Sequence, residues 1–292
     1  MIRRLKLLVI ILLFFLSISL GLLAAVTSRG ISLLEIALSV IPGQRIPNTT
    51  NVLVLGSDNT MGVHRSDTIM VLHIDPHIPR IFVLSIPRDT LVVIPGTGYD
   101  KINHAFAYGG PELSQKTAAA FLGVEIPYYV HIQVKRLERV IDRMGGITID
   151  VEKRLFYTDL AGGLRVDLQP GVQQLNGEQA LGYLRFRMDR EGDFGRIKRQ
   201  QNFLTALATE LLKPQNLPRF PLILGDFLSA VDTNIPSTEI GGFVSVLRTA
   251  YQAHNVQMTL LPGTSTRVNN VYYLQPDKME LQKILQEMQH GG

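Results

Sequence analysis

The sequence predicts an α/β domain, in which helices flank a central sheet, behind an N-terminal transmembrane helix. Three observations support this fold class. Short apolar runs bounded by glycine, proline and polar residues are typical of buried strands. Longer segments with apolar residues at helical spacing alternate with several of these runs. A continuous apolar stretch stands at the N-terminus, and no second run of that length follows it.

The N-terminal stretch at 7–26 is apolar apart from two serines and a glycine. At about 1.5 Å per residue it spans about 30 Å, which matches the hydrocarbon core of a bilayer. Arg3, Arg4 and Lys6 precede the run and predict a single-pass plasma-membrane protein with a cytoplasmic N-terminus and an extracytoplasmic domain. The alternative is a signal peptide cleaved near Leu23-Ala-Ala25. We favour the anchor because the run is longer than a typical signal-peptide core.

Composition shifts divide the chain into four parts. We expect a membrane anchor at 1–27, a linker at 28–50, one catalytic domain at 51–280, and a C-terminal helix end or tail at 281–292. Pro42-Gly43, Pro47 and a polar run indicate the linker.

The expected elements of the domain begin with three strands and then alternate. The loop at 75–79 contains two prolines and suits a hairpin, and 91–94 extends the preceding strand briefly. Gly145-Gly146 ends one helix. The expected strands are 52–55, 68–74, 80–86, 128–134, 147–151 and 257–261. The expected helices are 113–121, 137–144, 178–185, 196–212 and 237–251.

Composition limits the classes of molecule that the chain is expected to bind. The chain has no cysteine, so no disulfide supports the fold. Its formal net charge is +4. A basic chain can bind nucleic acid, but the predicted topology exports the domain, so we expect no nucleic-acid partner. Anionic lipid headgroups or wall polymers are the more plausible partners of a basic exported domain.

Two aspartates flank the first predicted strand connection. Asp58 follows the strand 52–55 and Asp67 precedes the strand 68–74, so neighbouring strands would bring both carboxylates to one rim of the sheet. Two carboxylates beside an anionic ligand need a hard cation between them, and Mg²⁺ with phosphate oxygens is the usual solution. The alternative is that both aspartates serve only the turn.

Arginine clusters in the second half of the domain. Arg185 and Arg187 share a face if the chain there is extended, and diverge if the helix continues. Arg196 and Gln200 lie one helical turn apart, on the face that continues as Leu204, Leu207 and Leu211. They would lie where the helix N-terminus offers free N–H groups to phosphate.

Two further arginine predictions follow. Arg88 comes shortly after the strand 80–86 and should also reach the rim. Guanidinium matches phosphate oxygens two at a time, so these arginines favour a phosphorylated ligand. We interpret Arg190 and Arg199 as solvated charges.

Other polar residues indicate weaker alternatives. His73, Asp75 and His77 alternate along a strand, as zinc ligands can, but we interpret them as the polar face of an edge hairpin. Ser57 and Ser85 have no evident histidine partner, which disfavours a serine nucleophile. Asp67, Asp89 and Asp193 are equal candidates for a general base.

A series of motifs, in order from about residue 51 to 277, resembles the LytR-CpsA-Psr family. The matching segments are Gly56-Ser-Asp58, Arg65-Ser-Asp-Thr-Ile69, Ser85-Ile-Pro-Arg-Asp-Thr90, Lys101-Ile-Asn103, Gly109-Gly110, Met144-Gly-Gly-Ile147, Leu175-Asn-Gly-Glu-Gln-Ala-Leu181, Tyr183-Leu-Arg-Phe-Arg187, Asp193-Phe-Gly-Arg-Ile-Lys-Arg-Gln-Gln201, Leu261-Pro-Gly263 and 273–277.

The resemblance implies an α-β-α sandwich with a central mixed β-sheet and a lipid pocket between sheet and helices. It also implies a phosphotransferase that moves a glycan phosphate from a polyprenyl-pyrophosphate carrier onto peptidoglycan or another envelope acceptor. A pyrophosphatase and an envelope-linked transcriptional attenuator are the alternatives.

The resemblance also assigns residues. Asp58 and Asp67 would hold Mg²⁺ or Mn²⁺. Asp67, Arg88 and Arg196 would be catalytic. The pyrophosphate contacts would be Arg65, Arg88, Arg185, Arg187, Arg196 and Gln200. The segment between Asp58 and Arg65 is shorter than is usual in the family and lacks an arginine directly after the aspartate.

Overall fold

The structure is a computed structural model. It describes residues 46, 48–57, 66–159, 164–186, 188, 192–211, 213, 215–216 and 220–290. These residues all fall in one compact unit, Gln44–Gly292. The predicted anchor at 7–26 lies outside the described residues, and no helix within them is long and apolar enough to cross a membrane.

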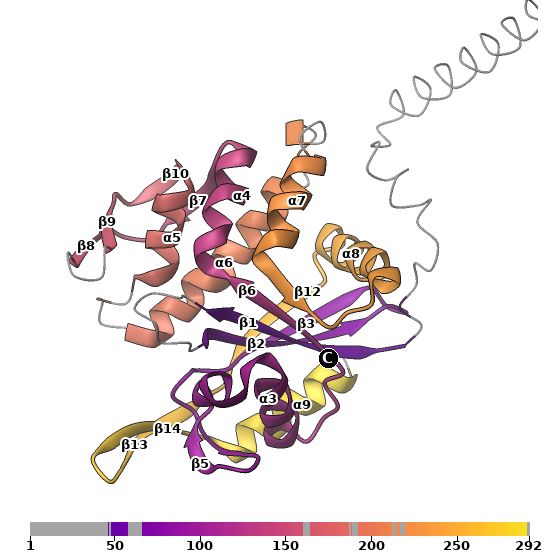
Figure 1. The fold of residues 1–292 in the computed structure, drawn as a ribbon, viewed down its shortest axis with the longest axis vertical. Coiled ribbons are helices and arrows are strands. Elements are labelled where there is room, and N and C mark those ends of the chain that lie inside the picture. The colour runs from indigo at the N-terminus through magenta and orange to yellow at the C-terminus, as the bar shows by residue number, and fades with distance from the viewer. Residues whose placement is uncertain are drawn as a thin grey trace, which may run out of the picture. The chain divides into compact units, whose positions relative to one another are not determined.

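A six-stranded mixed sheet forms the centre of the fold (Figure 1). Its strand order is β11-β6-β1-β2-β3-β12. The pairs β1–β6 and β3–β12 are parallel, and the other three pairs are antiparallel. The strands are β1 (Thr50–Ser57), β2 (Ser66–Asp75), β3 (Arg80–Ser85), β6 (Tyr128–Gln133), β11 (Val231–Thr233) and β12 (Val256–Leu260).

Helices cover both faces of this sheet, because strand residues alternate between the faces. Leu53 and Leu55 of β1 face the core under α3 (His104–Leu122) and α9 (Lys278–His290). Val52 and Val54, which alternate with these leucines along β1, pack on the opposite side with residues of α8 (Ser237–Gln252). Figure 1 shows α3 and α9 on one side of the sheet and α8 with the remaining helices on the other. The predicted mixed sheet flanked by helices is confirmed.

A second apolar core lies beside the sheet, among four helices and two strand pairs. Leu137, Leu184 and Phe203 are among its buried residues. The helices are α4 (Leu137–Met144), α5 (Gly177–Arg185), α6 (Gly192–Leu211) and α7 (Phe220–Ala230). The strand pairs are β7 (Ile147–Val151) with β10 (Gly171–Leu175), and β8 (Leu155–Asp159) with β9 (Leu164–Leu168). A short 3₁₀ turn, η2 (Val134–Arg136), joins β6 to α4.

Two small strand pairs lie under the sheet near α3 and α9 (Figure 1). They are β4 (Leu91–Ile94) with β5 (Gly98–Lys101), and β13 (Gly263–Val268) with β14 (Val271–Pro276). The prediction that β4 extends β3 is wrong. The Thr90 N–H donates to the Pro87 carbonyl at 3.0 Å, so the chain turns after β3 and β4 joins a different sheet.

Three other predictions differ from the structure. Helix α3 begins at His104 rather than at residue 113, and non-helical geometry at Gly109 and Gly110 kinks it. Strands β2 and β3 both have neighbours on each side, so the hairpin they form is central and not an edge. Helix α9 crosses the expected domain boundary at residue 280, and Leu281, Ile284 and Met288 belong to the core under the sheet.

Candidate active site

The ends of β2 and β3 and the first turns of α6 bring three charged side chains together. Asp67 is the second residue of β2, and its carboxylate Oδ1 lies 2.5 Å from Nη1 of Arg88. Nη1 of Arg196 lies 3.8 Å from the same oxygen. Nη2 of Arg196 also donates to the backbone carbonyl of Asp67 at 3.3 Å. We refer to Asp67, Arg88 and Arg196 as the Asp67 cluster.

Local geometry fixes Arg88 in this cluster. Pro87 precedes it and restricts the backbone at the end of β3. The Arg88 carbonyl accepts the Asn103 N–H at 3.2 Å, which ties the turn to the start of α3. Arg88 therefore points back at β2 from a turn held on both sides.

Burial differs sharply across the cluster. The Arg196 side chain is 5% exposed, whereas that of Asp67 is 39% exposed. Both guanidinium groups lie against the carboxylate of Asp67. An anion that reaches Asp67 would therefore meet two guanidinium groups, one of them in a low-dielectric position where charge interactions are strong.

A second charged pair adjoins the cluster. Oδ1 of Asp89 accepts from Nζ of Lys101 at 2.7 Å, and Oδ2 lies 3.8 Å from Nε of Arg88. Nζ of Lys101 also lies 5.8 Å and 5.7 Å from the ring centroids of Tyr272 and Tyr273. The general-base candidates Asp67 and Asp89 are thus both engaged by cations, and the side chain of Asp193 lies outside the described residues.

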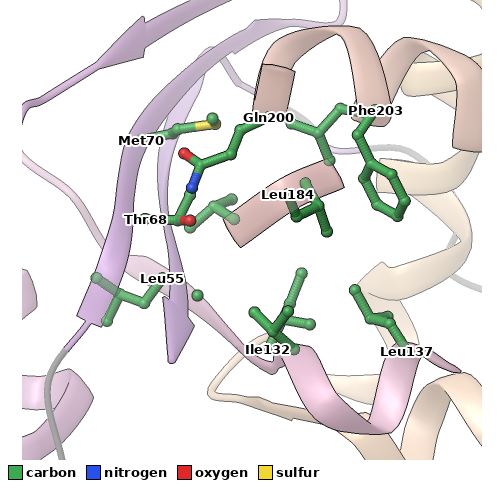
Figure 2. Close-up of a pocket in the computed structure, with 12 residues that line it drawn as sticks. Leu55, Thr68, Met70, Ile132, Leu137, Leu184, Gln200 and Phe203 are labelled. Carbon is green, nitrogen blue, oxygen red and sulfur yellow. The ribbon is translucent and has the colours of Figure 1, made fainter. Parts of the chain in front are cut away.

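An apolar pocket opens next to the Asp67 cluster (Figure 2). Its cavity volume is about 50 Å³, and the pocket is partly open to solvent. Thr68, the neighbour of Asp67, lines it, as does Gln200, one helical turn after Arg196. Figure 2 shows the Gln200 amide reaching across the pocket toward Thr68. The other lining residues are Val54, Leu55, Gly56, Met70, Ile132, Val134, Leu137, Leu184, Phe203 and Leu204.

The predicted face of α6 lies as expected. Arg196 and Gln200 are both buried on it, and Leu204 and Leu207 continue it into the pocket wall and the second core. The helix begins at Gly192, one turn before Arg196. Arg196 therefore lies in the second turn of the helix and not at its first residue.

Arg185 occupies a different environment. It is the last residue of α5, and the chain becomes extended at Phe186. Its side chain lines a polar pocket with Lys135, Glu138, Asp142, Arg165 and Glu178. Asp58, Arg65 and Arg187, which the sequence also assigned to the site, lie outside the described residues.

The interpretation of Arg199 as a solvated charge is wrong. Its side chain is 2% exposed, and Nη1 lies 2.7 Å from Oε1 of Glu152. Nη2 donates to the Phe186 carbonyl at 2.9 Å, and the guanidinium carbon lies 5.2 Å from the centroid of the Phe186 ring. Arg199 turns inward because it lies on the side of α6 that packs on the second core.

The sequence also missed a serine–histidine pair. The Ser57 side chain is hydrogen-bonded to Nε2 of His131 at 2.7 Å, between residues that are 74 apart. Burial lowers the pKa of His131, and the nearby Asp232 opposes that shift. Ser57 is 2% exposed, which keeps its hydroxyl away from any ligand in solution.

The proposed zinc ligands have other partners. Nδ1 of His73 is hydrogen-bonded to Oδ1 of Asn51 at 2.8 Å, and the His77 N–H donates to Asp75 at 2.8 Å. Within the part of the chain that the structure describes, no three His, Cys, Asp or Glu side chains group as metal ligands would.

Comparison with known proteins identifies the family of this chain. The sequence profile of the LytR_cpsA_psr family matches residues 37–290. The chain belongs to the LytR-CpsA-Psr family. The family extends through α9 to the end of the described residues, which agrees with the packing of that helix on the core.

Two relatives in this family carry different descriptions. The regulatory protein MsrR of Staphylococcus aureus is 39% identical over 193 residues, which cover 65% of this chain and 58% of MsrR. The chain thus spans little more than half the length of that relative. TagU of Bacillus subtilis, a polyisoprenyl-teichoic acid–peptidoglycan teichoic acid transferase, is 31% identical over 246 residues, covering 82% of this chain and 77% of TagU.

A solved family structure shares the fold and contains a ligand. TagT bound to LIIa-WTA superposes with a TM-score of 0.67 at 28% identity, covering 83% of this chain and 90% of TagT.

Proposed function

We propose that this chain transfers a glycan phosphate from a polyprenyl-pyrophosphate carrier onto peptidoglycan or another cell-envelope acceptor. One observation carries the proposal: the charged Asp67 cluster and the apolar pocket share a border at Thr68 and Gln200. A ligand with an anionic head and a hydrocarbon tail is complementary to both. The family assignment, the description of TagU and the ligand of TagT support the same chemistry.

The reaction exchanges the phosphoanhydride bond of the carrier for a new phosphate ester bond to the acceptor. The acceptor hydroxyl oxygen attacks the phosphorus that carries the glycan. The bond between that phosphorus and the bridging oxygen of the pyrophosphate breaks. The carrier leaves as polyprenyl phosphate, and the hydroxyl proton passes to a base. Arg88 and Arg196 bind the phosphates and stabilise the charge that spreads over their oxygens. No nucleophile from the protein is needed.

We propose that Arg65, Arg185, Arg187 and Gln200 complete the pyrophosphate site, with the first isoprene units in the apolar pocket. The pocket itself holds only about 50 Å³, well below the size of ordinary ligand pockets, so its walls must move apart before a tail can enter.

The described residues offer a divalent cation one carboxylate, that of Asp67, outside any larger group of metal ligands. The two arginines that contact the Asp67 carboxylate approach a single oxygen, Oδ1. The other oxygen, Oδ2, could therefore serve as a metal ligand at the exposed rim. Mg²⁺ and Mn²⁺ take such oxygen ligands together with phosphate. We propose Asp67 and Asp58 as the protein ligands. A bound cation would neutralise charge on the pyrophosphate.

We also propose that residues 7–26 anchor the chain in the plasma membrane, with the domain on the extracytoplasmic side. This topology places the site on the side of the bilayer where peptidoglycan lies, and away from nucleic acid.

A product assay tests the proposal. The full-length chain in detergent is given a polyprenyl-pyrophosphate glycan, Mg²⁺ and peptidoglycan oligomers, and products are separated by mass. We expect glycan joined to peptidoglycan through a phosphodiester, with release of polyprenyl phosphate. Free glycan phosphate in the presence of acceptor would instead indicate a pyrophosphatase. No turnover, together with a C-terminal topology reporter in the cytoplasm, would favour a regulator.

A further inference from the structure

The Ser57–His131 pair lies at the end of β1 that meets the candidate site. Ser57 is the last residue of β1, and His131 lies on the parallel neighbour β6. Their side chains are 2% and 8% exposed, and the hydrogen bond between them is 2.7 Å long. A buried bond of this kind is costly to break, because removal of one partner leaves the other without a hydrogen bond.

The His131 ring is fixed from more than one side. Its centroid lies 4.8 Å from that of the Phe106 ring on α3, and its residue pairs with Asp232 across the β6–β11 ladder. Because burial lowers its pKa, the ring is neutral at neutral pH. Neutral Nε2 either accepts the Ser57 O–H or donates N–H to Ser57 Oγ, and each tautomer makes one bond.

The β1–β2 pairing transmits the position of Ser57 to the Asp67 cluster. Ser57 pairs with Ser66 and Gly56 with Thr68, so the register shifts between them and Asp67 is the extra residue of a bulge on β2. The strands are tightly apposed there, since a Cβ on Gly56 would lie 2.9 Å from Cβ of Thr68. The buried Ser66 Oγ has no hydrogen-bond partner among the described residues, so within the Ser57–Ser66 pair the side-chain hydrogen bond found there is that of Ser57 to His131.

We propose that His131 is a positioning residue for Asp67, and that it acts through its hydrogen bond to Ser57. The inference rests on the proposed function only in taking the Asp67 cluster as the phosphate-binding site. Ser57 is too deeply buried to act as a nucleophile. We therefore assign the Ser57–His131 pair a structural role, which is to position Asp67.

The chain contains a matched control on the same two strands. His73 of β2 is 9% exposed, and its hydrogen bond of 2.8 Å to Asn51 of β1 is close in length to that of His131, although Asn51 is less buried than Ser57. Asn51 and His73 are partners near the other end of the β1–β2 ladder, far along both strands from Asp67. A general loss of stability should therefore follow either substitution, but a loss at the site should follow only one.

The test compares full-length variants by two measurements. Hydrogen exchange with mass spectrometry reports local opening at 66–70 without any ligand. Titration with a polyprenyl pyrophosphate reports affinity at a temperature where all variants are folded. We expect His131→Leu to raise exchange at 66–70 and to weaken affinity by about tenfold or more, as small misplacements at a site do. His73→Leu should lower the melting temperature similarly, with affinity within about twofold.

Two further variants separate the hydrogen bond from packing. His131→Gln carries an amide where Nε2 lay and should restore most of the affinity. Ser57→Ala removes the bond with a smaller change in volume. If both partners act through one bond, Ser57→Ala combined with His131→Leu should be no weaker in affinity than His131→Leu alone.

Three results would overturn the inference: equal loss of affinity in His73→Leu, additive losses in the double variant, or unchanged exchange at 66–70 in His131→Leu. If the wild-type chain binds the carrier but transfers nothing, the proposed function fails while affinity still tests His131. If it does not bind the carrier, the exchange measurement alone decides whether His131 positions Asp67.

Discussion

Arginines of similar sequence context play different parts in this chain, and burial together with partner identity separates them. Arg88 and Arg196 converge on Asp67, whose side chain is partly exposed, so a ligand can approach the cluster from the side of Asp67. Arg199, one turn from Arg196, is enclosed by Glu152 and Phe186. The sequence identified the first two through their position after a strand and on an amphipathic helix. It could not show that α6 is covered on two sides, which is what buries Arg199.

Substitution of Arg88 tests the phosphate assignment. We expect Arg88→Ala to reduce the transfer rate by about 100-fold to 1000-fold, the usual cost of losing one charge-stabilising donor. Arg88→Lys should recover only part of that loss, because an ammonium does not make a bidentate contact. Transfer kinetics check this, with Tyr99→Phe, at an exposed position on β5, as the control. Full activity in Arg88→Ala would contradict the assignment.

Arg199 should matter for stability instead. Arg199→Ala removes a buried partner of Glu152 and leaves a cavity against Phe186, so we expect a loss of about 2–4 kcal/mol in the free energy of unfolding. Lys198→Ala, at an exposed position on the same helix, should cost less than about 0.5 kcal/mol. Denaturant unfolding measures both. Equal stability of the two variants would mean that the Arg199 contacts contribute little.

At the level of elements, local signals made some predictions accurate and non-local pairing made others impossible. Helix α4 ends at Met144 as expected, because the left-handed Gly145 caps it. The short strands β8, β9 and β10 escaped notice, because their stability comes from partners and packing rather than from their own apolar residues. Helix α7 is mostly apolar, so the helical alternation of apolar and polar residues that would identify it is weak.

The apolar pocket is an element-level feature, made by β1, β2, β6 and the helices α4 to α6, and filling it should affect the lipid alone. We expect Leu204→Trp to weaken binding of a polyprenyl pyrophosphate by about tenfold or more, the scale on which apolar pockets discriminate. Binding of a water-soluble pyrophosphate should not change. Leu222→Trp, on the exposed side of α7, is the control. If both ligands weaken equally, the pocket does not hold the tail.

For the whole molecule, the fold class, the sheet and the meeting of Asp67, Arg88 and Arg196 could be predicted from strand ends and family motifs. The position of the apolar pocket beside the Asp67 cluster could not be predicted, because it depends on where α6 crosses the sheet. The Ser57–His131 hydrogen bond could not be predicted either. It joins two neighbouring strands, β1 and β6, that are separated in the sequence by four other strands and α3.

Global stability should depend on pH through the two buried histidines. Burial is the main cause that lowers the pKa of both His73 and His131. The unfolded chain protonates its histidines near pH 6.5, so below that value it binds more protons than the folded chain. Stability from this source is therefore complete above about pH 6.5 and falls as the pH decreases.

Thermal melts between about pH 7.5 and pH 5 check this expectation. The double variant His73→Gln, His131→Gln should show a flatter profile, whereas His254→Gln, at an exposed position, should follow the wild type. An identical slope in all three proteins would assign the pH dependence to other groups.

A crystal structure of the chain with a bound polyprenyl pyrophosphate tests the central claim most directly. We expect the pyrophosphate oxygens within hydrogen-bond distance of Arg88 and Arg196, and the first isoprene units among Leu184, Phe203 and Leu204. A pyrophosphate bound away from Arg88 and Arg196, with the apolar pocket empty, would contradict the account.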